Sequence, residues 1–431
     1  MKSIAFWIFL AATATVTLAD DWPQWRGPRA DGVWRESGIV TSLPDSTLLP
    51  RWRAPISSGY SGPTVAEGRV YLMDRITKPI QTERIHCFDW KSGEQLWSHT
   101  YPREYRNVGY TAGPRASVVI HDGLAYALGA MGDLHCLDAA SGKVIWQRDL
   151  LSEYQIRMPI WGIAASPVIF SDLVILQIGG ENACLIALDH RTGAERWRAL
   201  DDQASYSTPV LVEQAGQQVL VAWTGDHIAG LDPTSGRLHW QYPFPPRQMV
   251  IAIASPVISD NRVLVTNLFD GSLMLRMNPD RLEIEKIWQR VGQSEKQTDG
   301  LHSTISTPLV LGDYIYGIDS YGELRCLAAS TGERLWEDQT VVPHARWGTA
   351  HLVPNGEKVW IFNERGDLLL TSLSPEGIAI HSRAHLIDPT RDQLNQRGGV
   401  TWSHPAFAYR HIFVRNDEEL ICASLALDEA E

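Results

Sequence analysis

Short apolar runs bounded by turn residues recur along most of the chain. In one example, Ser255-Pro256-Val257-Ile258 opens a run, a turn follows at Ser259-Asp260-Asn261, and Arg262-Val263-Leu264-Val265 forms the next run. A further turn at Asp270-Gly271 leads into a third run. Such runs, separated by Asp, Asn and Gly, predict antiparallel β-strands joined by tight turns. Proline is tolerated where a strand begins, because that residue need not donate to the sheet.

A second motif ends each unit. The pattern Asp-x-x-(Ser/Thr)-Gly-x-x-x-Trp occurs at Asp89–Trp97, Asp138–Trp146, Asp189–Trp197 and Asp232–Trp240, and with Ala in place of Asp at Ala328–Trp336. The Asp and Ser/Thr side chains can hydrogen-bond the backbone of a turn, and Gly supplies the positive φ that closes a hairpin. The residues after Gly then form a strand that ends in Trp, so each unit holds four strands.

The closing tryptophans recur at intervals of 43 to 51 residues. They are Trp52, Trp97, Trp146, Trp197, Trp240, Trp288 and Trp336. A four-stranded repeat of this length is typical of a β-propeller blade, and recurrence with the repeat assigns these tryptophans to packing between blades. Blade seven has His381 where Trp is expected, and an eighth unit near Thr401 provides only three strands.

The missing strand of the eighth unit is predicted at the other end of the chain. The segment Leu49–Arg53 carries a Trp-ending strand without three strands before it. Pairing it with the last three strands closes the ring and removes exposed sheet edges. We therefore predict an all-β, eight-bladed propeller; the alternative is seven blades with an irregular tail.

The composition of the chain excludes some classes of binding partner. The formal net charge of -12 argues against nucleic acid, whose binding needs a basic surface. The five cysteines are Cys87, Cys136, Cys184, Cys326 and Cys422. Three of them share one repeat position and so fall in different blades, which favours small buried side chains over disulfides.

The chain divides into four segments. Residues 1–19, with Lys2, an apolar run and Thr17-Leu18-Ala19, are predicted to be a cleaved signal peptide. Residues 20–48 form an N-terminal extension, 49–425 the propeller and 426–431 an acidic tail. We expect an exported, periplasmic or extracellular monomer with no transmembrane span after cleavage.

The combination of Ser-Pro-Val, Asp-x-x-Thr-Gly and a strand-terminal Trp resembles the pyrroloquinoline-quinone-like (PQQ-like) propeller repeat, over roughly residues 50 to 425. Trp22-Pro23-Gln24-Trp25-Arg26-Gly27-Pro28 also looks like the opening of a group of exported propellers in this family. The resemblance implies one of two roles. One branch contains quinoprotein alcohol and sugar dehydrogenases, and the other contains non-enzymatic scaffolds similar to BamB.

The enzyme branch would require a quinone held by stacking and cations, a Ca²⁺ held by oxygen ligands, and a carboxylate base. The chain lacks the adjacent Cys-Cys of the alcohol dehydrogenases and the Cys-x-x-Cys-His of haem modules. The adjacent pairs His86-Cys87 and His135-Cys136 point to opposite sheet faces, so neither can chelate a metal. We assign no catalytic residue and no metal site, and expect no cofactor; PQQ with Ca²⁺ is the alternative.

Arginine and aromatic residues gather in the segments that join one blade to the next. The candidates for a binding funnel are Arg106, Tyr110, Arg115, Arg157, Trp161, Tyr206, His302, Arg346, Trp347 and Trp402. Arg binds carboxylates and stacks on rings, while Trp and Tyr offer apolar area with a polar end. The alternative is that the arginines form ion pairs and that Trp161 and Trp347 fill gaps between blades.

For the N-terminal Trp pair we expect a role within the fold, either plugging the channel or bracing the closing strand; the alternative is a docking motif for a partner. The sequence as a whole favours a non-catalytic exported propeller that binds a protein or a cell-envelope ligand. The alternatives are a PQQ-dependent dehydrogenase and a carbohydrate- or peptide-binding module.

Overall fold

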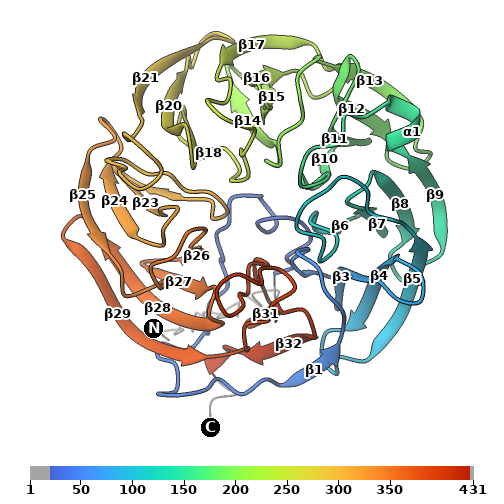
Figure 1. Ribbon diagram of the computed structural model, residues 1–431, viewed down its shortest axis with the longest axis horizontal. Coiled ribbons are helices and arrows are strands. Elements are labelled where there is room, and N and C mark those ends of the chain that lie inside the picture. The colour runs from blue at the N-terminus through green and yellow to red at the C-terminus, as the bar shows by residue number, and fades with distance from the viewer. Residues whose placement is uncertain (1–19, 428–431) are drawn as a thin grey trace, which may run out of the picture.

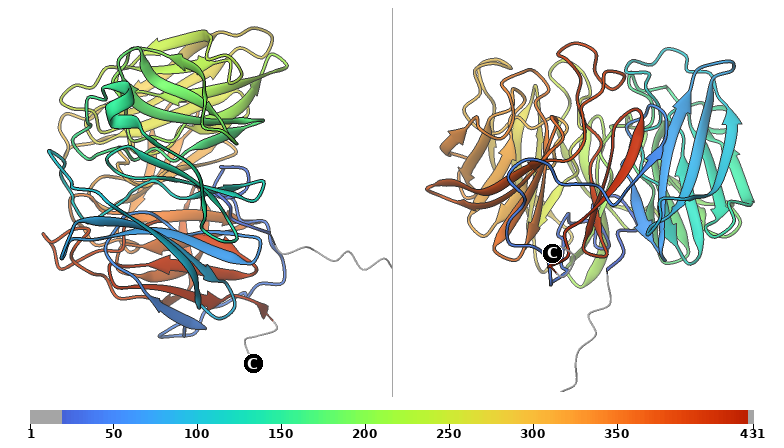
Figure 2. Two further views of the ribbon diagram at one scale, coloured as in Figure 1. Left: turned by 90° about the vertical axis from the view of Figure 1, so that its right-hand side faces the viewer. Right: turned by 90° about the horizontal axis from the view of Figure 1, so that it is seen from below.

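The computed structural model describes residues 20–427 and shows a ring of eight four-stranded antiparallel sheets (Figure 1). The predicted signal peptide lies outside these residues, as do the last four residues of the predicted acidic tail. Figure 2 shows the ring edge-on, with the long loops between blades extending from one face. No helix in the described range is long and apolar enough to cross a membrane.

Blades one to four follow one another along the chain. Blade one contains β2 (Thr64–Ala66), β3 (Arg69–Ile76), β4 (Thr82–Asp89) and β5 (Gln95–Pro102). Blade two contains β6 (Val119–His121), β7 (Leu124–Leu128), β8 (Asp133–Asp138) and β9 (Val144–Asp149), followed by the short helix α1 (Leu150–Tyr154). Blade three contains β10 (Val168–Phe170), β11 (Leu173–Gly180), β12 (Ala183–Asp189) and β13 (Glu195–Ala199). Blade four contains β14 (Val210–Gln214), β15 (Gln217–Trp223), β16 (His227–Leu231) and β17 (Leu238–Pro243).

The second half repeats this plan. Blade five contains β18 (Val257–Ser259), β19 (Arg262–Asn267), β20 (Gly271–Met277) and β21 (Ile284–Arg290). Blade six contains β22 (Leu309–Leu311), β23 (Tyr314–Ile318), β24 (Leu324–Ala328) and β25 (Arg334–Asp338). Blade seven contains β26 (Ala350–Asn355), β27 (Lys358–Asn363), β28 (Asp367–Ser374) and β29 (Gly377–His385). Blade eight contains β30 (Ala406–Ala408), β31 (His411–Arg415) and β32 (Glu419–Ser424), with β1 (Trp52–Pro55) as its fourth strand.

Strand β1 closes the ring, as the sequence predicts. It pairs antiparallel with β32, so that Trp52 lies opposite Cys422 and Pro55 opposite Glu419. The eight-bladed prediction is confirmed, and the seven-bladed alternative is wrong. Because β1 and β32 come from distant parts of the chain, the ring is closed by hydrogen bonds and packing.

The closing tryptophans contact the turn of the following blade. Trp97 donates its indole N–H to the Ala139 carbonyl at 3.1 Å, and a Cβ added to Gly142 would lie 2.6 Å from the Trp97 ring. The same arrangement joins Trp52 to the turn at Trp90 and Gly93, Trp146 to that at His190 and Gly193, Trp197 to that at Pro233 and Gly236, and Trp288 to that at Ala329 and Gly332. The Gly of the motif therefore has two functions: it adopts a positive φ and leaves room for the ring of the preceding blade.

Blade seven lacks a closing Trp because blade eight has no turn to receive it. The link from β32 to β1 is not continuous in the chain, so no Asp-x-x-(Ser/Thr)-Gly turn exists there. The N-terminal segment runs along β29 instead: Leu48 donates its N–H to the His385 carbonyl at 2.9 Å, and Leu43 donates to the Ser382 hydroxyl at 2.9 Å. Trp22 and Trp34 are buried in the same core as Trp360 and Phe407, next to the closure.

The cysteines are buried, as the repeat position of three of them predicts. Cys87, Cys136, Cys184 and Cys326 are buried thiols. Burial raises the pKa of the Cys87 and Cys136 thiols to about 12, so both are protonated at neutral pH.

Candidate functional site

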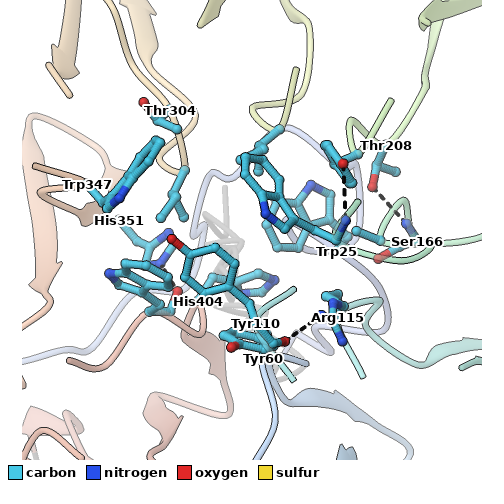
Figure 3. A pocket seen from close by; sticks show the side chains of 16 residues that line it. Trp25, Tyr60, Tyr110, Arg115, Ser166, Thr208, Thr304, Trp347, His351 and His404 are labelled. Atoms are coloured by element: carbon cyan, nitrogen blue, oxygen red, sulfur yellow. Dashed lines mark hydrogen bonds between the residues drawn. The ribbon is translucent and has the colours of Figure 1, made fainter. Parts of the chain in front are cut away.

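A cavity lies at the centre of the ring, where the loops between blades converge (Figure 3). We call it the central aromatic cavity; its volume is about 160 Å³. Its lining residues are Trp25, Tyr60, Tyr110, Arg115, Trp161, Ala164, Ser166, Tyr206, Thr208, Ile253, Thr304, Ile305, Trp347, His351, Trp402 and His404.

Every blade contributes one lining residue from the same place in the repeat. In seven blades this residue stands four positions before the first strand, and in blade seven it stands three positions before β26. The residues are Tyr60, Arg115, Ala164, Tyr206, Ile253, Ile305, Trp347 and Trp402. The cavity is thus a product of the repeat: its wall position is fixed by the fold, while its chemistry is set by which residue each blade places there.

Hydroxyl groups of the Ser/Thr-Pro motif tie neighbouring loops together around the cavity. Ser117 donates its backbone N–H to the Ser166 hydroxyl at 3.0 Å, and Ser166 donates its N–H to the Thr208 hydroxyl at 2.9 Å. Ser255 and Thr307 repeat the contact at 3.2 Å. These bonds connect the same position in successive blades, so they fix the residues just before it against the channel.

Two longer loops add further rings to the wall. Tyr110 lies between β5 and β6, and Trp161 lies between α1 and β10. The centroid of Trp161 is 5.0 Å from that of Tyr206, 5.9 Å from Tyr110 and 6.5 Å from Trp347, and Tyr110 lies 6.0 Å from Trp402. These spacings fall within or near the range of favourable aromatic contacts. The rings therefore form a continuous apolar wall.

The N-terminal segment reaches the cavity from the face opposite the long loops. Trp22 pairs its backbone with Val65 of β2, and the Pro23 carbonyl accepts the N–H of Ile120, beside the β6–β7 turn. Trp25 then extends to the channel, donates its indole N–H to the Ser255 hydroxyl at 2.9 Å, and contacts the His404 ring at 4.3 Å between centroids. The segment occupies the channel as a plug would, and Trp22 braces the junction of blades one and eight, with its backbone on Val65 and its ring 6.1 Å from that of Phe407.

Arg115 carries the formal charge in this wall. Its guanidinium donates to the backbone carbonyls of Gly109 at 2.9 Å, Tyr110 at 2.6 Å and Gly113, and lies 5.1 Å from the Tyr60 ring centroid. The two lining histidines are neutral at pH 7. Burial lowers the pKa of His351 to about 4 and that of His404 to about 3.

Six of the ten funnel residues predicted from the sequence line this cavity, and four lie elsewhere. The six are Tyr110, Arg115, Trp161, Tyr206, Trp347 and Trp402. Arg106 is exposed and pairs with Glu104 at 2.7 Å. Arg157 lines a neighbouring groove that shares Tyr206 with the cavity. Arg346 pairs with Glu295 at 2.7 Å and stacks on Trp347 at 4.4 Å.

His302 is a packing residue rather than a lining residue. It is 1% exposed, its Nδ1 bonds the Leu268 carbonyl at 2.8 Å, and its Nε2 accepts the Gly292 N–H at 3.1 Å. The sequence reasoning also omitted several lining residues, including Tyr60, Ile253, Ile305 and His351. The constant offset before each first strand is the signal that finds three of them; His351 lies inside β26 and follows no such rule.

The lining residues do not fit PQQ with Ca²⁺. Ca²⁺ takes six to eight oxygen ligands, mainly carboxylates and carbonyls. The lining includes no Asp, Glu, Asn or Gln. Across residues 20–427, no group of three or more His, Cys, Asp or Glu side chains is arranged to hold a metal ion.

The fold and cavity define the class: an eight-bladed propeller with Trp-docked blades and a plugged central channel. A family model described as "Outer membrane protein assembly factor BamB" matches residues 35–215 and 182–352. The chain belongs to this family of PQQ-repeat β-propellers. No curated protein matches the sequence.

Solved structures share the fold at low sequence identity. BamB from Moraxella catarrhalis is 14% identical, with a TM-score of 0.57, covering 88% of this chain and 100% of that one. The quinohemoprotein alcohol dehydrogenase from Comamonas testosteroni is 13% identical, with a TM-score of 0.62, covering 94% and 80%. A europium-containing methanol dehydrogenase is 11% identical, with a TM-score of 0.65, covering 93% and 90%.

Proposed function

We propose that this protein is a non-catalytic propeller, exported to the periplasm or the cell exterior, which binds a small ligand or a partner's side chain in the central aromatic cavity. The observation that carries the proposal is the convergence of eight loops and Trp25 on one cavity with seven Trp and Tyr side chains. Rings held this way offer a large apolar contact area at little entropic cost.

The polar groups of the cavity favour binding over chemistry. A general base works best with a pKa near the operating pH, whereas those of His351 and His404 lie far below it. The Ser166 and Thr208 hydroxyls accept backbone N–H groups of neighbouring blades, which occupies them structurally. None of the lining residues is a carboxylate that would activate them.

Ligand titration with a cavity variant tests the proposal. The mature protein would be titrated with small organic anions, sugars and short peptides, while tryptophan fluorescence and heat are recorded. We expect saturable one-to-one binding of at least one class, loss of that binding in Trp161→Ala, and retention in Trp90→Ala. Trp90 is the matched control, since it lies at the β4–β5 turn beside Tyr409, away from the cavity. Equal loss in both variants would contradict the assignment.

Two further measurements address the remaining parts of the proposal. Adding PQQ with Ca²⁺ is expected to give no saturable absorbance change and no dye reduction with alcohols or sugars; either signal would favour the dehydrogenase alternative. N-terminal sequencing of protein taken from the envelope or medium is expected to begin at Asp20. Protein that keeps Met1 in the cytoplasm would contradict export.

A further inference from the structure

Arg115 is the exception among the eight residues that the repeat places on the cavity wall. The other seven positions hold Tyr, Trp, Ile or Ala. Arg115 is half-buried against rings and so loses part of its hydration, which hydrogen bonds and a counter-charge would recover. The hydrogen-bond partners of its guanidinium therefore show whether a counter-charge is present or must come from a ligand.

The bonds of Arg115 hold its position, and among residues 20–427 no carboxylate forms an ion pair with it. All three acceptors, on Gly109, Tyr110 and Gly113, are neutral carbonyls of its own loop. A guanidinium has five N–H donors, so two donors remain after these bonds. The Tyr60 ring at 5.1 Å and the Tyr105 ring at 5.6 Å lie against the guanidinium. The group is preorganised for one more acceptor.

The carboxylate that contacts Tyr105 is already occupied by other donors. Glu83 is fully buried and accepts hydrogen bonds from the hydroxyls of Tyr101 and Tyr105 and from the backbone N–H of Ala130 at 3.1 Å. A second guanidinium, that of Arg75, stacks on Tyr105 at 3.8 Å. Glu83 is thus occupied by hydroxyl and amide donors, and the Tyr105 ring is shared by two guanidinium groups, those of Arg75 and Arg115.

The remainder of the wall selects the body of the ligand. Sugars need acceptors and donors such as carboxylates and carboxamides for their hydroxyls, and the lining has neither. An organic cation would suffer repulsion from Arg115. A volume of about 160 Å³ is small, and engineered apolar cavities of about 150 Å³ bind benzene. Flat apolar rings fit the faces of Trp161, Tyr206 and Trp402.

We infer that the ligand is a small organic carboxylate with a flat, ring-sized apolar body, its carboxylate on Arg115 and its body against the aromatic wall. This inference rests on the proposed function and specifies its ligand class. The same chemistry is offered by a free aromatic acid and by the terminal carboxylate of a chain that ends in an aromatic residue.

Calorimetry with matched probes tests the inference. The probes are benzoate, benzyl alcohol, choline and glucose, together with a tripeptide that ends in phenylalanine and its C-terminal amide. We expect benzoate to bind at least about tenfold more tightly than benzyl alcohol, because a charge-assisted hydrogen bond is roughly twice as strong as a neutral one. A preference for the peptide acid over its amide would identify the terminal carboxylate of a chain as the ligand. Binding of benzoate without binding of the peptide acid would identify a free aromatic acid.

Two variants from one loop separate charge from structure. In Arg115→Gln, the affinity for benzoate is expected to fall by at least about tenfold, while the affinity for benzyl alcohol stays within about twofold of its value in the unaltered protein. Arg106→Gln is the matched control, since its side chain is exposed and points its charge to Glu104. If Arg115→Gln does not fold, the ratio of benzoate to benzyl alcohol in the unaltered protein decides the question.

The outcomes distinguish the ligand class from the proposed function. Binding of benzyl alcohol, choline or glucose as tight as that of benzoate overturns the carboxylate inference and leaves the cavity as a binding site. Equal benzoate affinity in Arg115→Gln and the unaltered protein does the same. Absence of any binding to the cavity by the probes here and by the panel above overturns both.

Discussion

Trp240 donates its indole N–H to the side-chain oxygen of Gln214 at 2.8 Å, within its own blade. The other six closing tryptophans donate to a backbone carbonyl in the next blade instead. The next blade here is blade five, whose turn is Asn278-Pro279-Asp280 rather than Asp-x-x-(Ser/Thr)-Gly. The Gln214 amide nitrogen compensates by donating to the carbonyls of Asn278, Arg281 and Glu283 at 3.2, 3.0 and 2.8 Å. Gln214 therefore links blades four and five where the motif is lost.

Removing this link should destabilise the protein. In Gln214→Leu, the buried indole N–H and the carbonyls of blade five lose their partner, and an unsatisfied buried group costs about 1–3 kcal/mol. We expect the free energy of unfolding to fall by about that amount in urea. Gln218 is an exposed residue on the neighbouring strand β15, so Gln218→Leu is the control and should change the free energy of unfolding by less than about 0.5 kcal/mol. Equal stability of the two variants would refute the role given to Gln214.

The contact between Gly142 and Trp97 can be tested against a glycine of the same conformation. Gly142 and Gly123 both have a φ of 70°, but a Cβ at Gly142 would lie 2.6 Å from the Trp97 ring, whereas Gly123 has nothing within 4 Å. Gly123→Ala should cost only the left-handed backbone penalty of about 1–2 kcal/mol. Gly142→Ala should cost a further 1–3 kcal/mol or so, because the ring must move. Denaturant unfolding of both variants measures the difference, and equal losses would show that the Trp97 ring imposes no constraint.

Much of the fold can be predicted from the sequence, because the signals that form each blade lie within a few residues of one another and recur in successive blades. Turn chemistry, as at Asp89 and Ser92, fixes each hairpin within a few residues, and the lone strand at Trp52 has no other place to pair. The absence of Trp at position 381 follows from the same logic, because blade eight lacks the receiving turn. Each of these features depends either on residues close together in the sequence or on the number of repeat units.

The site is less predictable because it joins residues from every blade. Arg115 and Trp161 stand out in the sequence as loop residues rich in binding chemistry. Arg106 and Arg157 lie in loops of the same composition, yet their side chains lie outside the cavity. A constant offset from the first strand places one side chain of each blade on the channel, next to the Ser/Thr hydrogen bonds, but Tyr110 and Trp161 reach the cavity from longer loops and follow no such offset. Trp25 could be placed only once its segment was seen to pair with β2.

The buried histidines of the cavity predict sensitivity to acid. Burial lowers the pKa of His351 to about 4 and that of His404 to about 3, against an ordinary value of 6.5. The unfolded chain then binds more protons than the folded one, so stability is complete above pH 6.5 and is lost as the pH falls toward 4. Thermal unfolding between pH 7.5 and 4 should show a falling Tm. His404→Gln should make the Tm depend less on pH. His121 is the exposed last residue of β6, so His121→Gln should leave the pH dependence of the Tm unchanged.

His385 predicts the opposite pH dependence for the N-terminal segment. Burial lowers its pKa, but hydrogen bonds to Asp367 at 2.9 Å and Asp388 at 3.0 Å outweigh this and leave the pKa raised. A raised folded pKa gives a contribution that is complete below pH 6.5 and is lost as the pH rises through the folded value. The backbone of His385 holds the N-terminal segment, through bonds with Ser46 at 2.8 Å and Leu48 at 2.9 Å.

Hydrogen exchange can follow this attachment directly. The protection factor of the Leu48 amide, corrected for intrinsic exchange, should decrease from pH 6 to pH 9 as His385 loses its proton and its attraction to the two carboxylates. In His385→Gln the protection should be lower at pH 6 and nearly independent of pH. The Val65 amide, which donates to the Trp22 carbonyl at 2.9 Å and makes no hydrogen bond to His385, serves as the internal reference. A Leu48 amide that keeps the same protection across this range would show that the charge on His385 does not stabilise the closure.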